Sequence, residues 1–564
     1  MKKGSVAMAK STGRYEEIPA LQLRGPELRR SMRTFIQAFM FSMIWMACIA
    51  GSQMKILCRM IGFDDFEFGA LGSLPFIAAF GQVISAVVIE KTNLRKRYLV
   101  RFGLFNRLSW VIVAAIPLLW PGLPSAVAVR LTLIVLGLGW FFGSMMQPAW
   151  MSWIGNMVPK RIRGRYMAAR IWWGQPIYMV AVIAIGFLLD ACTDPNAPET
   201  AAAQPMLLYA CCGILVAGQL FGLLDLFLIS RIRDVMPRIA GSDGLPTSDF
   251  KVAKPSRWTA LSGLGYGVRT GARVVHQTLL EPLTDRGFRH YVLYAATITF
   301  AVSVGAWFFW LQAMENLGFS KLAANILLLV VGPLSGMLSA KMWGRLIDRL
   351  GRRPVLVLAT LGTLLGASVW FLVTRDTPAP QFIATAANWL SHAIGTLVGH
   401  PEWTLVTSDT PLGAYLGVGA ACMVGGCFWT GMALAQMSVM LGFADGKGQS
   451  RYLAASAVLV SFGGVLGGLV GGAVAQSLSY LQDAPIVLGP LIWNNYHATF
   501  ALSVLGQVVS LVFLWGMPDP GATRVRHLIR MTGANIYNAI MPRFFSARSL
   551  GRHQGPADRE SGRR

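Results

Sequence analysis

The chain has 564 residues, of which 54% are hydrophobic and only 13% are charged. Soluble globular proteins carry about 25% charged residues, so this composition argues against a water-soluble enzyme. The formal net charge of +24 would suit a nucleic-acid-binding domain, but here the Lys and Arg residues lie in short stretches between apolar segments, and we expect no nucleic-acid partner.

Twelve apolar segments follow one another along the chain, each near the ~20 residues that cross a bilayer as a helix. They cover 34–54, 66–89, 98–120, 127–149, 166–189 and 206–230, and then 291–312, 321–344, 354–374, 412–441, 453–476 and 497–517. The sequence therefore predicts an all-α polytopic membrane protein with two sets of six transmembrane helices.

Most of the 50 Lys and Arg residues lie in the two tails and in every second loop. The positive-inside rule then places both termini in the cytoplasm, as in a multi-pass protein of the cell membrane. The predicted regions are a basic N-terminal tail, a six-helix half, a cytoplasmic linker, a second six-helix half and a basic C-terminal tail, at 1–33, 34–230, 231–290, 291–517 and 518–564.

Two cytoplasmic loops carry matching motifs in the two halves. Residues 344–353 read GRLIDRLGRR, and residues 86–97 give a looser copy, AVVIEKTNLRKR. Further along, GRYMAA at 164–169 is echoed by SRYLAA at 450–455. A longer loop at 375–411 accounts for the different spacing of the two pairs, so duplication of a six-helix unit is the simplest interpretation.

The loop at 344–353 resembles the G-x-x-x-D-R-x-G-R-R signature of the major facilitator superfamily, found between the second and third helices of each half. The resemblance covers all twelve predicted spans. It implies a transporter fold of two pseudo-symmetric halves, and a cytoplasmic latch built from these loops that sets the inward/outward equilibrium. The alternative is that the basic loops only fix the topology.

The acid of the second-half loop, Asp348, is predicted at the C-terminal end of a helix, where a carboxylate opposes the helix dipole and needs nearby cations. We expect Gly344 to permit close helix approach and Gly351 to permit a tight turn. The candidate gate residues are Glu90, Lys91, Arg95, Arg97, Arg165, Gly344, Asp348, Arg349, Gly351, Arg352, Arg353 and Arg451.

By the same resemblance, the first, fourth, seventh and tenth spans line a central cavity. Polar side chains in hydrocarbon need partners, so hydroxyls and amides in these spans are candidates for a wet cavity, although each hydroxyl can instead bond to its own helix. The candidates are Gln37, Ser42, Ser144, Gln147, Thr297, Thr299, Ser303, Trp307, Trp429 and Gln436.

Two ionisable residues lie within predicted spans, Arg107 in the third and Asp225 in the sixth. Such residues are costly in a bilayer and are functional candidates by default. Arg107 is predicted either to bind an anionic substrate or to pair with an acid, and Asp225 is a candidate for that acid. If the third helix protrudes into the cytoplasm, Arg107 lies simply near the interface.

The eleventh span contains glycine pairs repeated every four residues between Gly463 and Gly472. Small residues at this spacing let a neighbouring helix approach closely, so we predict one smooth packing face there.

No cofactor or metal site is expected, because the seven Cys residues show no ligand spacing and the seven His residues form no catalytic pattern. No P-loop indicates ATP-driven pumping. The sequence therefore favours a monomeric secondary transporter that moves a small solute by alternating access, with or without a coupling ion. A transporter-like receptor or assembly partner is the alternative, and a membrane-embedded enzyme is a third.

Overall fold

The computed structural model describes residues 25–82, 84–85, 95–158, 162–194, 196–198, 200–232, 281–398, 410–443, 449–488 and 491–517. Most of the predicted N-terminal tail, most of the linker, and the C-terminal tail lie outside the described residues. So do the gate candidates Glu90 and Lys91, and the side chains of Arg95 and Arg451.

The N-terminal half consists of helices that match the first six predicted spans. They are α1 (Gly25–Ala50) with its continuation α2 (Ser52–Ile61), α3 (Asp65–Ala78), α5 (Arg95–Leu119), α6 (Ser125–Met157), α7 (Arg163–Ala191) and α8 (Pro205–Ser230).

The C-terminal half repeats this pattern with two broken helices. A 3-10 turn η4 (Glu281–Thr284) precedes α10 (Arg286–Gly305), α11 (Phe308–Leu311) and the π-helical η5 (Gln312–Asn316). The next span consists of α12 (Lys321–Ile326), the π-helical η6 (Leu327–Val331) and α13 (Gly332–Leu350). The remaining elements are α14 (Arg352–Val369), α15 (Gln381–Val398), α16 (Leu412–Phe443), α17 (Gln449–Ser477), α18 (Tyr480–Asp483), the strands β1 (Ile486–Leu488) and β2 (Leu491–Trp493), and α19 (Asn495–Trp515).

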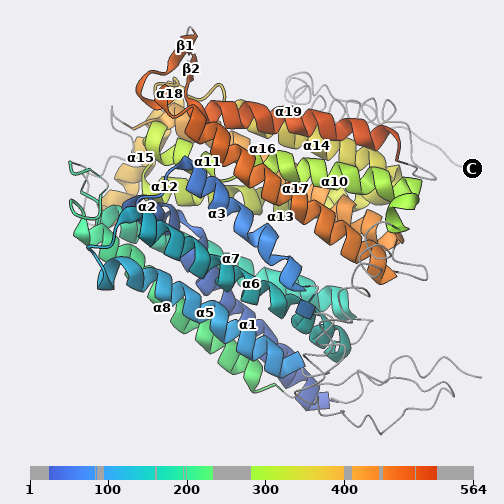
Figure 1. Cartoon of the computed structure of the whole chain (residues 1–564). Helices are drawn as coiled ribbons and strands as arrows, with labels where there is room; N and C mark the ends of the chain where they lie inside the picture. Colours follow the sequence, from blue (N-terminus) through green and yellow to red (C-terminus); the bar gives the residue numbers. More distant parts are fainter. Residues whose placement is uncertain are drawn as a thin grey trace, which may run out of the picture.

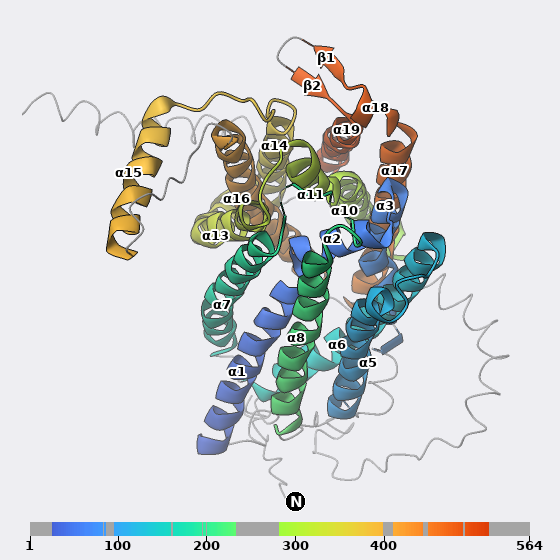
Figure 2. The same ribbon diagram turned by 90° about the vertical axis from the view of Figure 1, so that its left-hand side faces the viewer.

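The helices run side by side in two layers, the C-terminal half above the N-terminal half in Figure 1. The antiparallel β1–β2 pair marks one end of the bundle, called here the hairpin end. The N-terminal end of α1 and the C-terminal end of α19 lie at the opposite end, called the termini end (Figure 1). Seen from the hairpin end, α3 lies beside α17 and α7 lies beside the α12–α13 segment (Figure 2).

Eleven helical segments of the described chain are long and apolar enough to cross a membrane. The twelfth, α3, has 14 described helical residues and occupies the place of the predicted span 66–89. The predicted all-α fold with two six-helix halves is therefore confirmed.

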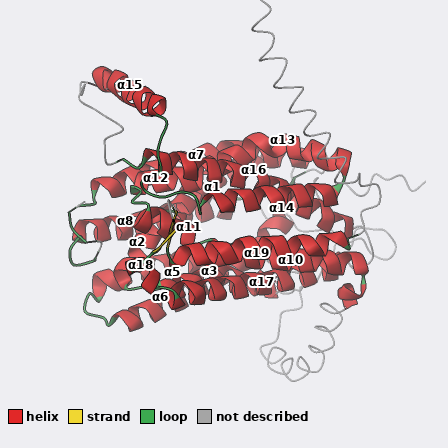
Figure 3. Cartoon of the chain, turned by 90° about the horizontal axis from the view of Figure 1, so that it is seen from above, coloured by secondary structure: helices red, strands yellow, loops and turns green. Residues whose placement is uncertain are grey.

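The loop predicted at 375–411 is wrong in part, because it contains the helix α15. This helix has 18 residues with no Asp, Glu, Lys or Arg, and it lies apart from the bundle (Figures 2 and 3). Phe382 and Trp389 are more than 70% exposed there. Its apolar sequence is shorter than a full span, so it was not distinguishable from an insertion.

The glycines of α17 form two packing faces where the sequence predicted one. On one face, a Cβ at Gly467 would lie 2.4 Å from the Phe300 carbonyl oxygen of α10. On the other, a Cβ at Gly468 would lie 2.7 Å from the Gly69 carbonyl oxygen of α3. Successive helical residues point about 100° apart, so each glycine pair serves both neighbours.

Gly467→Ala is expected to destabilise the protein by about 1–3 kcal/mol, because the added methyl group meets backbone atoms of α10 that cannot yield without moving a helix. Thermal unfolding in detergent measures the effect. The matched control is Gly213→Ala in α8, where no described atom lies within 4 Å of the added Cβ and the substitution should be neutral or slightly stabilising. Equal melting temperatures for both variants would contradict the packing role.

Candidate functional site

The N-terminal half contains a cavity of about 470 Å³ that is lined by side chains from all six of its spans. Residues predicted from the sequence that line it are Ser42, Arg107, Ser144, Gln147 and Asp225. Gln37 does not line it, but faces a hollow at the termini end together with three arginines of the first turns of α1.

Arg107 and Asp225 form an ion pair at this cavity, with 3.4 Å between Nη2 and Oδ2. Their side chains are only 4% and 7% exposed. Arg107 Nη1 also donates to Asn106 Oδ1 at 2.8 Å, whereas Arg107 Nε has no acceptor among the described residues. The third and sixth spans are thus joined by the two ionisable residues that the sequence singled out.

Two neighbouring helices, α1 and α8, fix the position of Arg107. Its Cζ lies 3.4 Å from the ring centroid of Trp45 in α1. Trp45 Nε1 donates to Gln219 Oε1 of α8 at 2.8 Å, which holds the ring. A Cβ at Gly222 of α8 would lie 2.4 Å from Arg107 Nε, so the glycine makes room for the guanidinium.

A second cation, Arg170 of α7, lines the same cavity and was not singled out from the sequence. Its Cζ lies 3.7 Å from the ring centroid of Phe39 and 4.2 Å from that of Trp150. The structure gives it no hydrogen bond or ion pair to a described residue. The planar Arg170 guanidinium is therefore held by cation–π contacts with two aromatic rings.

The smaller polar residues of the cavity differ in their surroundings. Ser42 lies beside the Asp225 carboxylate. The Ser144 hydroxyl is 2.8 Å from the Phe141 carbonyl oxygen of its own helix, and it also contacts the Ala78 carbonyl oxygen of the neighbouring span. Gln147 is exposed. Ser144 is thus satisfied by backbone and Ser42 by the Asp225 carboxylate, while Gln147 remains available to a bound solute.

The C-terminal half contains a separate cavity of about 350 Å³. Ser303 and Trp429, both predicted candidates, line it. Its polar centre is a chain in which the Thr363 hydroxyl donates to Gln507 Oε1 at 3.1 Å. No described charged side chain lines this cavity, in contrast to the cavity of the N-terminal half.

Four candidates from the seventh and tenth spans line neither cavity: Thr297, Thr299, Trp307 and Gln436. Trp307 lies between the two halves, because a Cβ at Gly72 of α3 would lie 2.5 Å from its Cδ1. Lys55 Nζ lies over it at 4.8 Å and donates to the Ala50 carbonyl oxygen at the end of α1. Trp307 thus packs at the interface of the halves.

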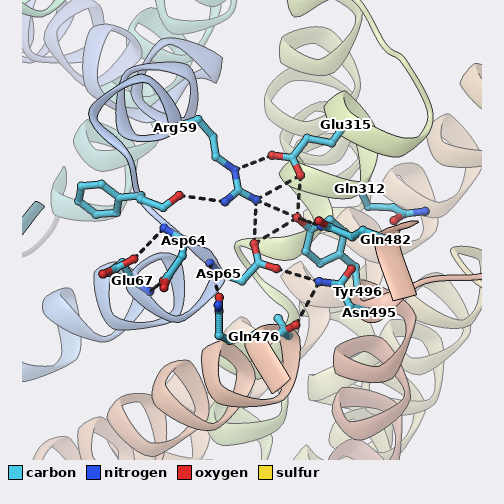
Figure 4. Close-up of polar contacts among 12 residues, drawn as sticks. Arg59, Asp64, Asp65, Glu67, Gln312, Glu315, Gln476, Gln482, Asn495 and Tyr496 are labelled. Carbon is cyan, nitrogen blue, oxygen red and sulfur yellow. Dashed lines mark hydrogen bonds and ion pairs between the residues drawn. The ribbon is translucent and has the colours of Figure 1, made fainter. Parts of the chain in front are cut away.

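At the hairpin end, a polar network centred on Arg59 of α2 joins the halves (Figure 4). Arg59 Nη2 is 2.7 Å from Asp65 Oδ1, and Arg59 Nε is 2.7 Å from Glu315 Oε1. The Tyr496 hydroxyl donates to Glu315 Oε2 at 2.6 Å, and Asn495 Nδ2 donates to Asp65 Oδ2 at 2.8 Å. Arg59 and Asp65 belong to the N-terminal half, and their three partners belong to the C-terminal half.

A second set of contacts joins α7 to α12. The Asp190 carboxylate accepts hydrogen bonds from the backbone N–H groups of Lys321 and Leu322, at 2.7 and 3.0 Å. The Asn325 side chain accepts from the Ser52 N–H and donates to the Val182 carbonyl oxygen. A carboxylate at a helix N-terminus is favourably placed. Asp190 of the N-terminal half therefore caps the start of α12 in the C-terminal half.

At the termini end, the exposed gate candidates form no ion pair across the halves with a described residue. Asp348 and Arg349 are exposed at the end of α13, and Arg97 and Arg165 are exposed at the start of α5 and α7. Among described residues Asp348 has no ion pair.

The other gate candidates of the second half lie within that half. Arg352 and Arg353 are half-buried at the start of α14. Gly351 has φ +91°, which permits the turn between α13 and α14, as expected. A Cβ at Gly344 would have no described atom within 4 Å, and the close helix approach expected there stays a prediction.

Sequence reasoning missed Arg170 and the Arg59 network for one reason. Arg170 is five residues beyond Arg165, where a basic residue is interpreted as an orientation signal. Arg59 and Glu315 lie at span ends, where charges are ordinary. The sequence did contain one usable signal. The basic Arg59 and the acidic Glu315 follow corresponding spans of the two halves, so they are predicted at the same side of the membrane.

Comparison with known proteins identifies this architecture. A sequence model of the Major Facilitator Superfamily matches residues 34–430. The structure is similar to the nucleoside transporter NupG, with a TM-score of 0.53 and 13% identity over 87% of this chain and 99% of that one. It is equally similar to the xylose transporter XylE from E. coli in an inward open conformation, with a TM-score of 0.53 and 13% identity over 89% and 99% of the two chains. No curated protein matches the sequence.

Asp225→Asn is expected to destabilise the protein by about 3–5 kcal/mol, because it leaves the buried Arg107 guanidinium without a counter-ion. Arg107→Gln should cost a similar amount for the converse reason. The double variant should be less destabilised than the sum of the two, as measured by unfolding in detergent. Additive effects would show that the pair makes no coupled contribution to stability.

Proposed function

The chain belongs to the Major Facilitator Superfamily, and we propose that it moves a small solute across the cell membrane by alternating access between its two six-helix halves. Family membership makes it a multi-pass membrane transporter and not an enzyme. The proposal adds the mechanism, the small-molecule substrate and the placement of both termini in the cytoplasm.

The distribution of polar contacts between the halves carries this proposal. Eleven hydrogen bonds that join described residues of the two halves all lie between the middle of the helices and the hairpin end. At the termini end, the exposed charged residues Arg97, Arg165 and Asp348 make no ion pair to a described residue. This is the distribution of a transporter closed at one end and separable at the other.

The Arg59 network has the properties of a reversible gate. The ion pair that crosses between the halves is partly exposed, with side-chain exposures of 27% for Arg59 and 33% for Glu315. Partly exposed pairs contribute roughly 1 kcal/mol or less each, so they bias a conformational equilibrium without locking it. With the termini in the cytoplasm, as the excess of Lys and Arg there favours, this network closes the outer face.

Glu315→Gln is expected to shift the protein toward a state open at the hairpin end, because it removes one charge of the inter-half network while keeping the shape of the side chain. Spin labels at Gly122 and Asp376, one on each half and both exposed, would report longer distances by pulsed electron resonance.

Asp483→Asn is the matched control, since Asp483 is an exposed acid at the same end without an ion pair to a described residue. The same distance distribution in wild type, Glu315→Gln and Asp483→Asn would contradict the gate.

Asp348→Asn tests the opposite end. If the loop at 344–353 latches the halves when the termini end closes, this variant should lower the uptake rate in proteoliposomes several-fold at normal expression. The structure leaves Asp348 exposed, as a latch in its open state requires. Unchanged uptake in Asp348→Asn would restrict this loop to fixing topology.

A further inference from the structure

The charges of the N-terminal cavity do not balance. Its described lining includes two guanidinium groups, Arg107 and Arg170, and one carboxylate, Asp225. Arg107 is the one that pairs with Asp225. Arg170 therefore supplies a surplus positive charge, and the cavity of the C-terminal half holds no described charge that could offset it.

The way in which Arg170 is held leaves its donors free. Phe39 and Trp150 contact the guanidinium through their rings, at 3.7 and 4.2 Å from the ring centroids. Such stacking occupies the faces of the planar group and not its N–H edges. A guanidinium has five N–H donors in a fixed fork that matches a carboxylate. Arg170 is thus pre-oriented with its edges available, half-buried at the cavity wall.

The rest of the cavity is mostly apolar and aromatic. Trp45, Trp140 and Trp150 line it together with three methionines. The volume of about 470 Å³ lies in the range of ordinary small-molecule pockets. A wall of this kind suits an apolar or aromatic body.

We propose that the N-terminal cavity binds an organic monoanion, a carboxylate on an apolar or aromatic body, with Arg170 as its main anchor. This rests on the proposed function, in that the cavity is taken to lie on the path of the solute. The carboxylate neutralises the surplus charge of Arg170, while Arg107 stays paired with Asp225. A dianion would leave the cavity negative, and a cation would add to its positive charge.

Benzoate and 2-naphthoate are suitable probes, with benzamide and benzylamine as neutral and cationic counterparts of the same ring. Binding is measured by calorimetry on the purified full-length protein in detergent at pH 8 and low salt, where both carboxylates are ionised. We expect saturable binding of the two carboxylates, at least about tenfold tighter than that of benzamide or benzylamine.

Arg170→Gln should weaken benzoate binding at least about tenfold and leave the weaker binding of benzamide unchanged, which shows that the cavity is still folded. Arg170→Lys should give an intermediate affinity, because it keeps the charge and loses the fork. Arg101→Gln is the matched control, since Arg101 is exposed on α5 near the same end and lines neither cavity.

The proposal is overturned if benzamide binds as tightly as benzoate, if neither carboxylate binds at millimolar concentration, or if Arg170→Gln binds benzoate like wild type. Solute counterflow in proteoliposomes distinguishes failure of the anion-binding proposal from failure of the transport proposal. Flux of a neutral solute without carboxylate binding refutes the anion class alone. Arg170-dependent binding of benzoate without any flux upholds the site and refutes transport.

Discussion

Close approach of helix backbones is the constraint on which this structure depends. Lipid tails are as apolar as the side chains of a membrane helix, so helices associate through packing and polar contacts and not through a hydrophobic force between them. Helix α17 meets this requirement twice, with Gly467 against α10 in its own half and Gly468 against α3 in the other. One helix therefore stabilises the C-terminal half and also forms the contact between the halves.

Polar contacts then make the interface between the halves different at its two ends. The Arg59 network and the Asp190 cap both lie at the hairpin end, where charged side chains reach water and can exchange partners. The buried Arg107–Asp225 pair differs, because it lies within one half and at 4% and 7% exposure has no solvent to replace a lost partner. A partly exposed ion pair between the halves is weak enough to break and re-form when a gate moves. The buried Arg107–Asp225 pair is costly to break, so it keeps the cavity lining in one arrangement.

The cavities of the two halves differ in the charge of their described lining residues. Charge is confined to the N-terminal cavity, and the C-terminal cavity offers apolar surface and a short chain of neutral hydrogen bonds through Thr363 and Gln507. The two six-helix halves thus have different linings.

The sequence by itself determined the membrane class, the twelve spans and the two halves, and it singled out Arg107 and Asp225 as charges within spans, because apolar length and the cost of buried charge act locally along the chain. Only the tertiary structure decided that Arg107 meets Asp225 across two helices, that Trp307 packs between the halves, and that Arg170 lies between two rings. Those outcomes depend on the rotation of each helix about its axis, which is set by packing against its neighbours and is not encoded in hydropathy.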